Sequence, residues 1–413
     1  MIPVMLATIL IFAAACGTKN HPVSEGALDD TKFGKEDYKK VVSANNELGF
    51  KLLEEIETDE NGNSFISPTS LLMALSMVYN GADGVTKEEI ATVLQLEGIE
   101  KDELNKANAS MLSILQKDSD QIQLNVANSI WINDRFHFQD EFAQQNKDYF
   151  NAAIEVIDVA DKKSPKLLND WVKASTNDKI VEIVNEDVPF NHDLVAYLVN
   201  AIYFKGDWMY AFDKEQTTDS VFQLEDGTTK DILLMALYEE LAYMENEDFQ
   251  AVALPYGDGK MSMTVFLPRE ALSLEQFKQM LTQENWEKWQ LDFHKKDGTI
   301  LLPKFQLEYE VLLNDTLQKL GIRSAFDEGA DFTKMIQEAD PIWISKVQQN
   351  TFIDVDEEGT EAAAATTIEV VTESAKIDTP FYMEVNRPFF IAITDDETGT
   401  ILFMGTIANP IEK

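Results

Sequence analysis

Few side chains in this sequence could carry out chemistry. The chain has a single cysteine, Cys16, and no histidine lies in an H-E-x-x-H pattern, so the usual zinc sites are excluded. A G-x-S-x-G nucleophile turn and a G-x-x-x-x-G-K-[ST] phosphate loop are both absent. The 73 aspartates and glutamates are too numerous for one pair to be singled out as acid and base. The sequence therefore predicts no metal, no cofactor and no enzyme. The histidines are His21, His137, His192 and His294.

One stretch, residues 355–372, stands out because two conformations compete for it. Its four consecutive alanines favour a helix, whereas the β-branched residues that follow them favour a strand. In a strand, side chains alternate between two faces, and Glu361 and Glu369 fall on the same face. The other face, which begins with Thr360, carries no charge and could enter a sheet without burying one. Because only small side chains would hold this segment in place, we predict that it is a moving part.

The start of this stretch resembles the hinge of the reactive loop in serpins, the suicide inhibitors of proteases. The resemblance implies that the loop offers a peptide bond to a protease and, once cut, enters the main sheet as a new strand. The alternative for the stretch alone is an alanine-rich surface linker. The hinge residues are Glu357, Glu358, Gly359, Thr360, Glu361, Ala362, Ala363, Ala364, Ala365 and Thr366.

The resemblance also implies which bond the protease attacks. In serpins this bond usually lies about fifteen residues along, counting the hinge glycine Gly359 as the first, which gives Glu373–Ser374. Counting back from the C-terminal strands agrees with this position. A glutamate before the bond implies a glutamate-preferring protease. If the loop is read one residue shorter, Thr372 precedes the bond, with Val371 before it, and an elastase-like protease is implied.

A second set of residues matches the region where the serpin sheet opens. Ser67, Ser70 and Asn200 match its usual members, and Trp208 matches the tryptophan where the loop begins to insert. Gln349 stands ten residues before the hinge glycine, where the family usually has a histidine. Glutamine can both donate and accept hydrogen bonds, so the network is expected to survive. It cannot gain a positive charge, so any pH sensitivity supplied by that histidine should be absent.

Other segments indicate the elements that position the loop. Ser67 before Pro68 predicts a capped helix start, and the run from Thr86 to Glu89 predicts a capping box at the start of another helix. Residues 198–204 form a nearly continuous apolar run, interrupted by Asn200, as expected of a central strand covered on both faces. These motifs resemble those of serpins and occur in the order found in that family.

The resemblance extends from about Lys35 to Pro410 and implies the fold. We expect an α+β protein with three β-sheets, the largest a mixed central sheet, and about eight to nine helices. One domain, residues 35–413, would carry an exposed reactive loop at about residues 359–380. The implied activity is suicide inhibition of a serine protease, with a cysteine protease as the second choice, through a covalent one-to-one complex. The alternative is a non-inhibitory serpin-like binding protein.

The charge balance limits the possible partners. The chain has 34 lysines and arginines against 73 acidic residues, a formal net charge of −39. A surface this acidic should repel phosphate backbones and anionic polysaccharides. We therefore expect neither a nucleic-acid partner nor a heparin-like activator. A monomer is expected.

The N-terminus indicates export. The apolar run from Ile2 to Ala15 is too short to span a bilayer and is typical of a signal peptide, residues 1–15. Its end, Ala-Ala-Ala-Cys-Gly, resembles a bacterial lipobox, in which Cys16 would carry lipid. Residues 16–34 are polar and are predicted to be a flexible tether. A bacterial protein held outside the cell by its lipid is therefore expected. The alternative is plain secretion after cleavage following Ala15.

Overall fold

The computed structural model of this protein describes residues 28–116, 121–191, 194–338, 341–360 and 379–411. The predicted signal peptide, Cys16 and most of the predicted tether therefore lie outside the described residues. Within these ranges, no helix is both long and apolar enough to cross a membrane.

Nine α-helices occur among the described residues. They are α1 (Val42–Glu55), α2 (Pro68–Gly81), α3 (Gly84–Val93), α4 (Lys101–Leu115), α5 (Asp140–Phe150), α6 (Ser164–Ser175), α7 (Leu274–Lys278), α8 (Gln283–Asp292) and α9 (Asn314–Leu320).

Fifteen strands form two hydrogen-bonded sheets in the same ranges. The six-stranded sheet has the order β10 (Phe305–Leu312), β11 (Ile344–Val355), β12 (Gly359–Thr360), β4 (Ala196–Asp207), β2 (Ile122–Asn133) and β3 (Ala153–Ile157). The nine-stranded sheet has the order β1 (Ser64–Ile66), β15 (Thr400–Ile407), β14 (Phe389–Asp395), β8 (Met261–Pro268), β7 (Phe249–Tyr256), β6 (Thr229–Glu245), β9 (His294–Pro303) and β13 (Phe381–Glu384), with β5 (Thr218–Gln223) paired to β6.

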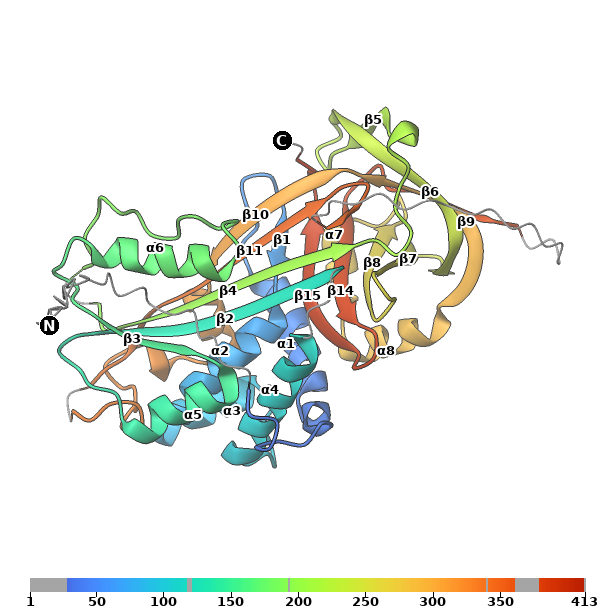
Figure 1. Ribbon diagram of the computed structural model, residues 1–413. Coiled ribbons are helices and arrows are strands. Elements are labelled where there is room, and N and C mark those ends of the chain that lie inside the picture. Colours follow the sequence, from blue (N-terminus) through green and yellow to red (C-terminus); the bar gives the residue numbers. More distant parts are fainter. Residues whose placement is uncertain (1–27, 117–120, 192–193, 339–340, 361–378, 412–413) are drawn as a thin grey trace, which may run out of the picture.

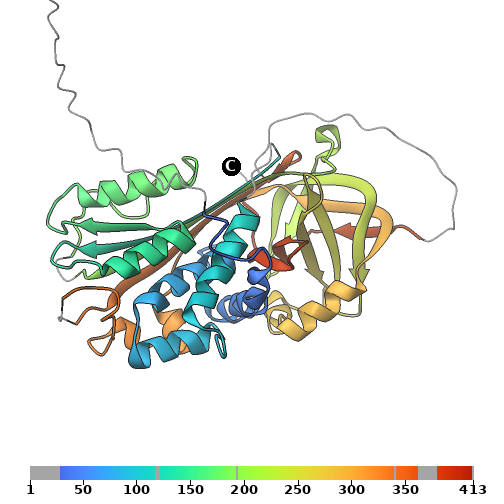
Figure 2. The ribbon, with the colours of Figure 1, turned by 60° about the horizontal axis from the view of Figure 1, so that its bottom comes forward.

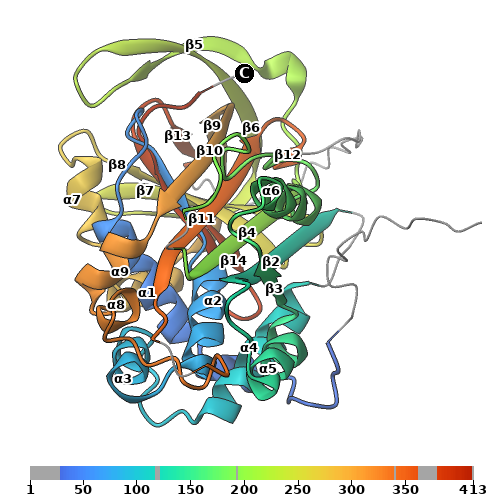
Figure 3. The same ribbon diagram turned by 90° about the vertical axis from the view of Figure 1, so that its left-hand side faces the viewer.

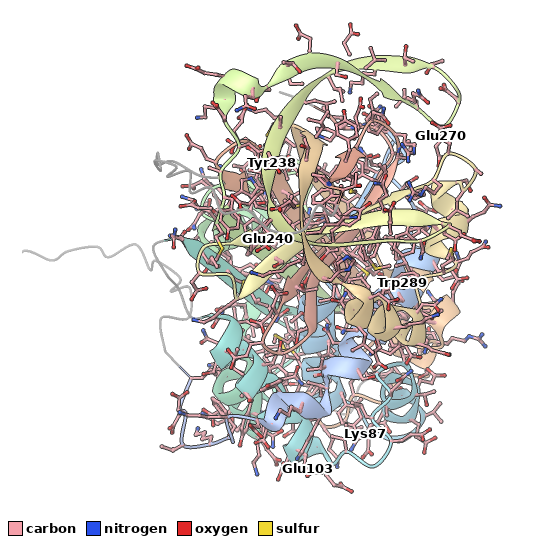
Figure 4. All side chains as sticks on the ribbon, turned by 90° about the vertical axis from the view of Figure 1, so that its right-hand side faces the viewer. Lys87, Glu103, Tyr238, Glu240, Glu270 and Trp289 are labelled. Carbon is pink, nitrogen blue, oxygen red and sulfur yellow. The ribbon has the colours of Figure 1, made fainter. Side chains whose placement is uncertain are left out.

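The long strand β6 explains why the strands outside the six-stranded sheet form one nine-stranded sheet. Its C-terminal part pairs with β7, and most of its length pairs with β9. It therefore joins two groups of strands that would otherwise be separate sheets. Tyr238 and Glu240 of β6 lie on the side of the molecule shown in Figure 4, where Tyr238 is largely exposed.

Helices cover both faces of the six-stranded sheet. Helix α6 lies over one face, and α2 to α5 lie on the opposite side (Figures 1 and 2). The apolar side chains of α6, including Leu168 and Val172, are buried against Tyr197 and Val199 of β4. Because both faces are covered, β4 is apolar along most of its length, as the sequence predicts for residues 198–204.

Two predicted helix starts have different outcomes. Helix α2 begins at Pro68, and the Ser67 side chain accepts from the backbone N–H of Ser70, as predicted. The predicted capping box at Thr86 is wrong, because α3 begins at Gly84 with Asp83 as its N-cap. Thr86 is instead buried inside the helix, where its hydroxyl accepts a hydrogen bond from the backbone N–H of Asp331. A tertiary contact, which the local pattern does not reveal, uses the hydroxyl that would have capped the helix.

Candidate functional site

Gly359 and Thr360, which form β12, already lie inside the six-stranded sheet. Strand β11 pairs in parallel with β4 from Ile344 to Thr351. Beyond that point β12 lies between them, where Thr360 is paired antiparallel with Val355 of β11 and Gly206 of β4 (Figure 3). The chain therefore turns back after β11 and begins a new strand between two neighbours that are parallel to each other.

A close approach of two backbones requires glycine at the start of β12. A Cβ atom on Gly359 would lie 2.2 Å from the carbonyl oxygen of Gly206 and 2.7 Å from the Cα atom of Asp207. Both neighbours are backbone atoms of β4, so neither can move aside as a flexible side chain would. A larger residue at position 359 would have to push β12 away from β4.

Aromatic rings hold the entry point of this segment. The rings of Trp208 and Tyr256 are stacked, with centroids 4.5 Å apart and planes 9° from parallel. The Trp208 indole N–H donates to the carbonyl oxygen of Asp356 at 3.0 Å, and the Tyr256 hydroxyl lies 2.6 Å from that of Thr360. Thr360 is 1% exposed, and burial raises the pKa of the Tyr256 hydroxyl. The two stacked rings thus bind Asp356, just before the hinge, and Thr360, within it.

The two glutamates before Gly359 are fixed by ion pairs. Glu357, with its side chain 6% exposed, accepts from Lys304 at 2.7 Å and from the Thr217 hydroxyl at 2.8 Å. Burial alone would raise the pKa of Glu357, but the Lys304 ammonium and the other hydrogen bonds outweigh it and lower that pKa. Glu358 pairs with Lys214 at 2.5 Å nearer the surface.

A separate polar network lies under the parallel part of the sheet. The Gln349 amide oxygen accepts from the backbone N–H of Ser67 at 2.9 Å. Its amide nitrogen donates to the Ser67 carbonyl oxygen at 2.9 Å and to the Asn200 side-chain oxygen at 2.8 Å. Gln349, Ser67 and Asn200 are all at most 1% exposed. One glutamine therefore ties β11 and β4 to the residue that caps α2.

Asn200 extends this network toward α2 and β2. Its amide nitrogen donates to the Ser70 hydroxyl and, at 2.6 Å, to the side-chain oxygen of Asn128. The network of Gln349, Ser67, Ser70, Asn200 and Asn128 contains no ionisable side chain. Its hydrogen bonds should therefore be insensitive to pH in the physiological range.

The structure brings the predicted residues together in two places. Ser67, Ser70, Asn200 and Gln349 form the network just described, and Trp208 lies instead at the hinge with Glu357, Glu358, Gly359 and Thr360. The remaining predicted site residues fall outside the described ranges. They are Cys16, Glu361, Ala362, Ala363, Ala364, Ala365, Thr366, Val371, Thr372, Glu373 and Ser374.

The sequence did not reveal several contacts of the hinge. Lys304 is one of 34 basic residues and follows a Leu-Pro pair without any local sign of its partner. Tyr256 is the last residue of β7, and only the pairing of β7 with its neighbouring strands places it under the hinge. Neither contact has a sequence signal, because each joins segments at least fifty residues apart. Among the described residues, no group of three or more His, Cys, Asp or Glu side chains could hold a metal ion.

Comparisons with known proteins agree on one family. Residues 43–410 match the family described as serpin (serine protease inhibitor). Human Serpin B4 is 32% identical over 390 residues, covering 90% of this chain and 99% of the relative. An uncharacterized serpin-like protein from Methanosarcina acetivorans is 31% identical, covering 90% of this chain and 88% of its own length. The native crystal structure of tengpin, a thermophilic serpin, matches with a TM-score of 0.82 and 30% identity, covering 89% of this chain and 94% of tengpin.

Proposed function

Because this chain belongs to the serpin family and has its α+β fold, we propose that it is a suicide-substrate inhibitor of serine proteases. Members of this family are mostly inhibitors rather than catalysts. The observation that supports the proposal best is the position of β12. Gly359 and Thr360 are already paired with β4, at the position from which a cut loop would continue as a new strand.

The proposed reaction uses the chemistry of the protease. The active-site serine of the protease attacks the peptide carbonyl at the bait bond, and an ester to the loop forms as the amide bond breaks. The new amino terminus leaves with the C-terminal fragment. The freed loop, still bound to the protease as an acyl group, continues from Thr360 into the sheet as a central strand.

The length of the inserted strand sets how far the protease moves. About fourteen residues at ~3.3 Å each give roughly 46 Å. Insertion must be faster than hydrolysis of the ester by water, which favours small, uncharged residues on the face that becomes buried. The alternating pattern that begins at Thr360 meets this requirement.

We place the bait bond at Glu373–Ser374, with a glutamate-preferring protease as the target. Burying a carboxylate in a protease pocket costs several kcal/mol unless a cation or several donors meet it. Proteases with small apolar pockets should instead cut after Val371 or Thr372, which leaves elastase-like enzymes as the second target class. The partner would be bound covalently, one to one, by a monomer.

We further propose that Cys16 carries lipid and holds the inhibitor on the outside of a bacterial cell. The support is the apolar run that ends in Ala-Ala-Ala-Cys, followed by a polar segment up to residue 34. Secretion without lipid is the alternative for the same residues.

Incubation of the full chain with a panel of serine proteases tests the proposal. We expect a covalent complex that survives boiling in detergent on a denaturing gel, together with release of a C-terminal peptide. If every protease yields cleaved chain with no complex and no gain in thermal stability, the protein is a non-inhibitory serpin-like binding protein instead.

A further inference from the structure

A polar pocket of about 430 Å³ lies among the helices on the side of the six-stranded sheet opposite α6. It is formed where the end of α2 and the starts of α3, α4 and α5 meet the segment around Lys334. Figure 4 labels Lys87 of α3 and Glu103 of α4 at this end of the molecule, far from the hairpin of β5. The pocket is remote from the hinge and plays no part in the proposed inhibition. Its volume falls in the range of pockets that bind small molecules.

Three lysines from three different segments line this pocket. They are Lys87 of α3, Lys101 of α4 and Lys334. The facing acidic groups are Asp83, 3.7 Å from Lys334, and Glu141, 3.4 Å from Lys101. Among the side chains that line the pocket, three ammonium groups against two carboxylates leave one unit of positive charge, in a chain whose formal net charge is −39.

Lys87 supplies the excess charge. Within the described ranges it forms no ion pair, and its ammonium lies 4.9 Å from the centre of the Tyr79 ring. A cation near a ring keeps its capacity to bind an anion, because the contact uses only one side of the ammonium group. The lysine is therefore available to a ligand.

The backbone adds to this positive potential. Helix α5 begins at Asp140 without a side-chain cap, and Glu141 and Phe142 of its first turn line the pocket. The first N–H groups of a helix have no partner within the helix and carry a partial positive charge. The carboxylate of Glu141 lowers this potential and competes for Lys101, which makes Glu141 a useful position for a test.

One residue of the pocket lining, Asn80, has a buried acceptor without a partner among the described residues. Asn80 is 4% exposed, and its amide nitrogen donates to the side-chain oxygens of Asn105 at 2.9 Å and Asn146 at 3.2 Å. The Asn80 side-chain oxygen has no hydrogen-bond partner within the described ranges. A buried acceptor is expected to be met by a donor, and a water molecule beside the pocket could supply one.

From these observations we propose that the pocket binds a small, hydroxyl-bearing oxyanion, with its phosphate or sulfate group held by Lys87, Lys101 and Lys334. The carboxylates around the lysines accept hydrogen bonds from the ligand hydroxyl groups, and the side-chain amides can accept or donate them. Polymeric anions are disfavoured because they would extend over the acidic surface outside the pocket. A small anion avoids this repulsion, since at physiological ionic strength charges beyond about 8 Å are largely screened.

Isothermal titration calorimetry of the full chain tests the proposal, with glucose 6-phosphate, inorganic phosphate and glucose as probes at matched ionic strength. We expect saturable binding of glucose 6-phosphate, weaker binding of phosphate and none of glucose. Lack of saturable binding of all the oxyanions would overturn the proposal.

Matched variants separate the pocket from general charge effects. Lys87→Gln and Lys101→Gln should each weaken binding of glucose 6-phosphate by about three-fold, and Glu141→Gln should strengthen it by removing the competitor of Lys101. The control is the Lys319–Glu55 pair, which lies outside the pocket with a similar separation of 3.5 Å. Lys319→Gln and Glu55→Gln should leave the affinity unchanged. Equal effects of the pocket and control variants on the affinity would refute the site. The gain in affinity expected from Glu141→Gln cannot be produced by a failure to fold.

Discussion

The hydroxyl oxygens of Tyr256 and Thr360 lie 2.6 Å apart, and both side chains are fully buried. The second residue of β12 is thus anchored to β7, a strand of the other sheet. Its neighbour Gly359 meets the backbone of β4 too closely to carry a side chain. The beginning of the hinge is therefore fixed, and any movement of the loop must start after Thr360.

Thr360→Arg should convert an inhibitor into a substrate. A guanidinium at this position would be buried without a partner, and the Tyr256 hydroxyl would lose its own. The protease should still cut the loop, while the yield of covalent complex on a denaturing gel falls on the order of tenfold. Thr360→Ser, which keeps the hydroxyl, is the matched control and should inhibit like the parent. Unchanged complex formation by Thr360→Arg would mean that the buried position of Thr360 does not control insertion of the loop.

Gln349→His should make the stability of the native protein depend on pH. A neutral histidine can accept from the Ser67 N–H and donate to one nearby oxygen, whereas the protonated form cannot accept and buries a charge. Burial should therefore lower the folded pKa of this histidine below ~6.5, so that stability is lost as the pH falls below that value. The measurement is the urea midpoint between about pH 8 and pH 5. The parent sets the baseline, and equal slopes for parent and variant would contradict the prediction.

Lys304→Met should destabilise the hinge at neutral pH. It leaves the buried Glu357 carboxylate with the Thr217 hydroxyl, at a cost of about 1–3 kcal/mol in the free energy of unfolding. Because the folded pKa of Glu357 is lowered, the contribution of the pair is complete above the ordinary glutamate value and is lost as the pH falls through the folded pKa. Urea midpoints of parent and variant should therefore converge in acid.

The control for this experiment is Lys319→Met. The Lys319–Glu55 pair is exposed, so its loss should change the free energy of unfolding by less than about 1 kcal/mol. A similar loss in both variants would show that the Lys304 effect is only a change of surface charge.

Glu373→Arg should redirect the inhibitor toward trypsin-like proteases. These enzymes accept a basic residue before the bond, so the variant should form a detergent-stable complex with trypsin that the parent does not form. Mass determination of the released peptide checks the position directly, since cleavage at the proposed bond gives a peptide that begins at Ser374. A peptide from the parent that begins at Thr372 or Glu373 would support the elastase-like assignment.

Cys16→Ser should release the protein from the membrane. A lipid on Cys16 would carry the parent into the detergent phase of a phase-partitioning assay, and the serine variant should remain in the aqueous phase. Equal partitioning of the two proteins would exclude a lipid on this residue. Ser24→Ala, within the predicted tether, is a suitable control.

Local chemistry made much of the architecture predictable. Ser67-Pro68 predicts the start of α2, and the nearly continuous apolar run 198–204 predicts a strand covered on both faces. The alternation from Thr360 predicts an uncharged face, and Thr360 itself is buried. The sequence could not reveal that Asp83 rather than Thr86 caps α3, since the Thr86 hydroxyl is used by Asp331, far along the chain. For the same reason Lys304 and Tyr256 gave no sign of their contacts with Glu357 and Thr360, because pairing of distant strands creates those contacts.

The direction of the strands around β12 has a consequence for the whole sheet. From Ile344 to Thr351, β11 and β4 run in the same direction and are joined by seven residue pairs. A strand that separates them while running the opposite way, as β12 does, replaces one parallel seam by two antiparallel seams. Antiparallel pairs are slightly more stable per residue than parallel ones. The native sheet therefore has one strand fewer than an arrangement with more, and more stable, strand pairs. The present pairing of β11 with β4 does not provide those pairs.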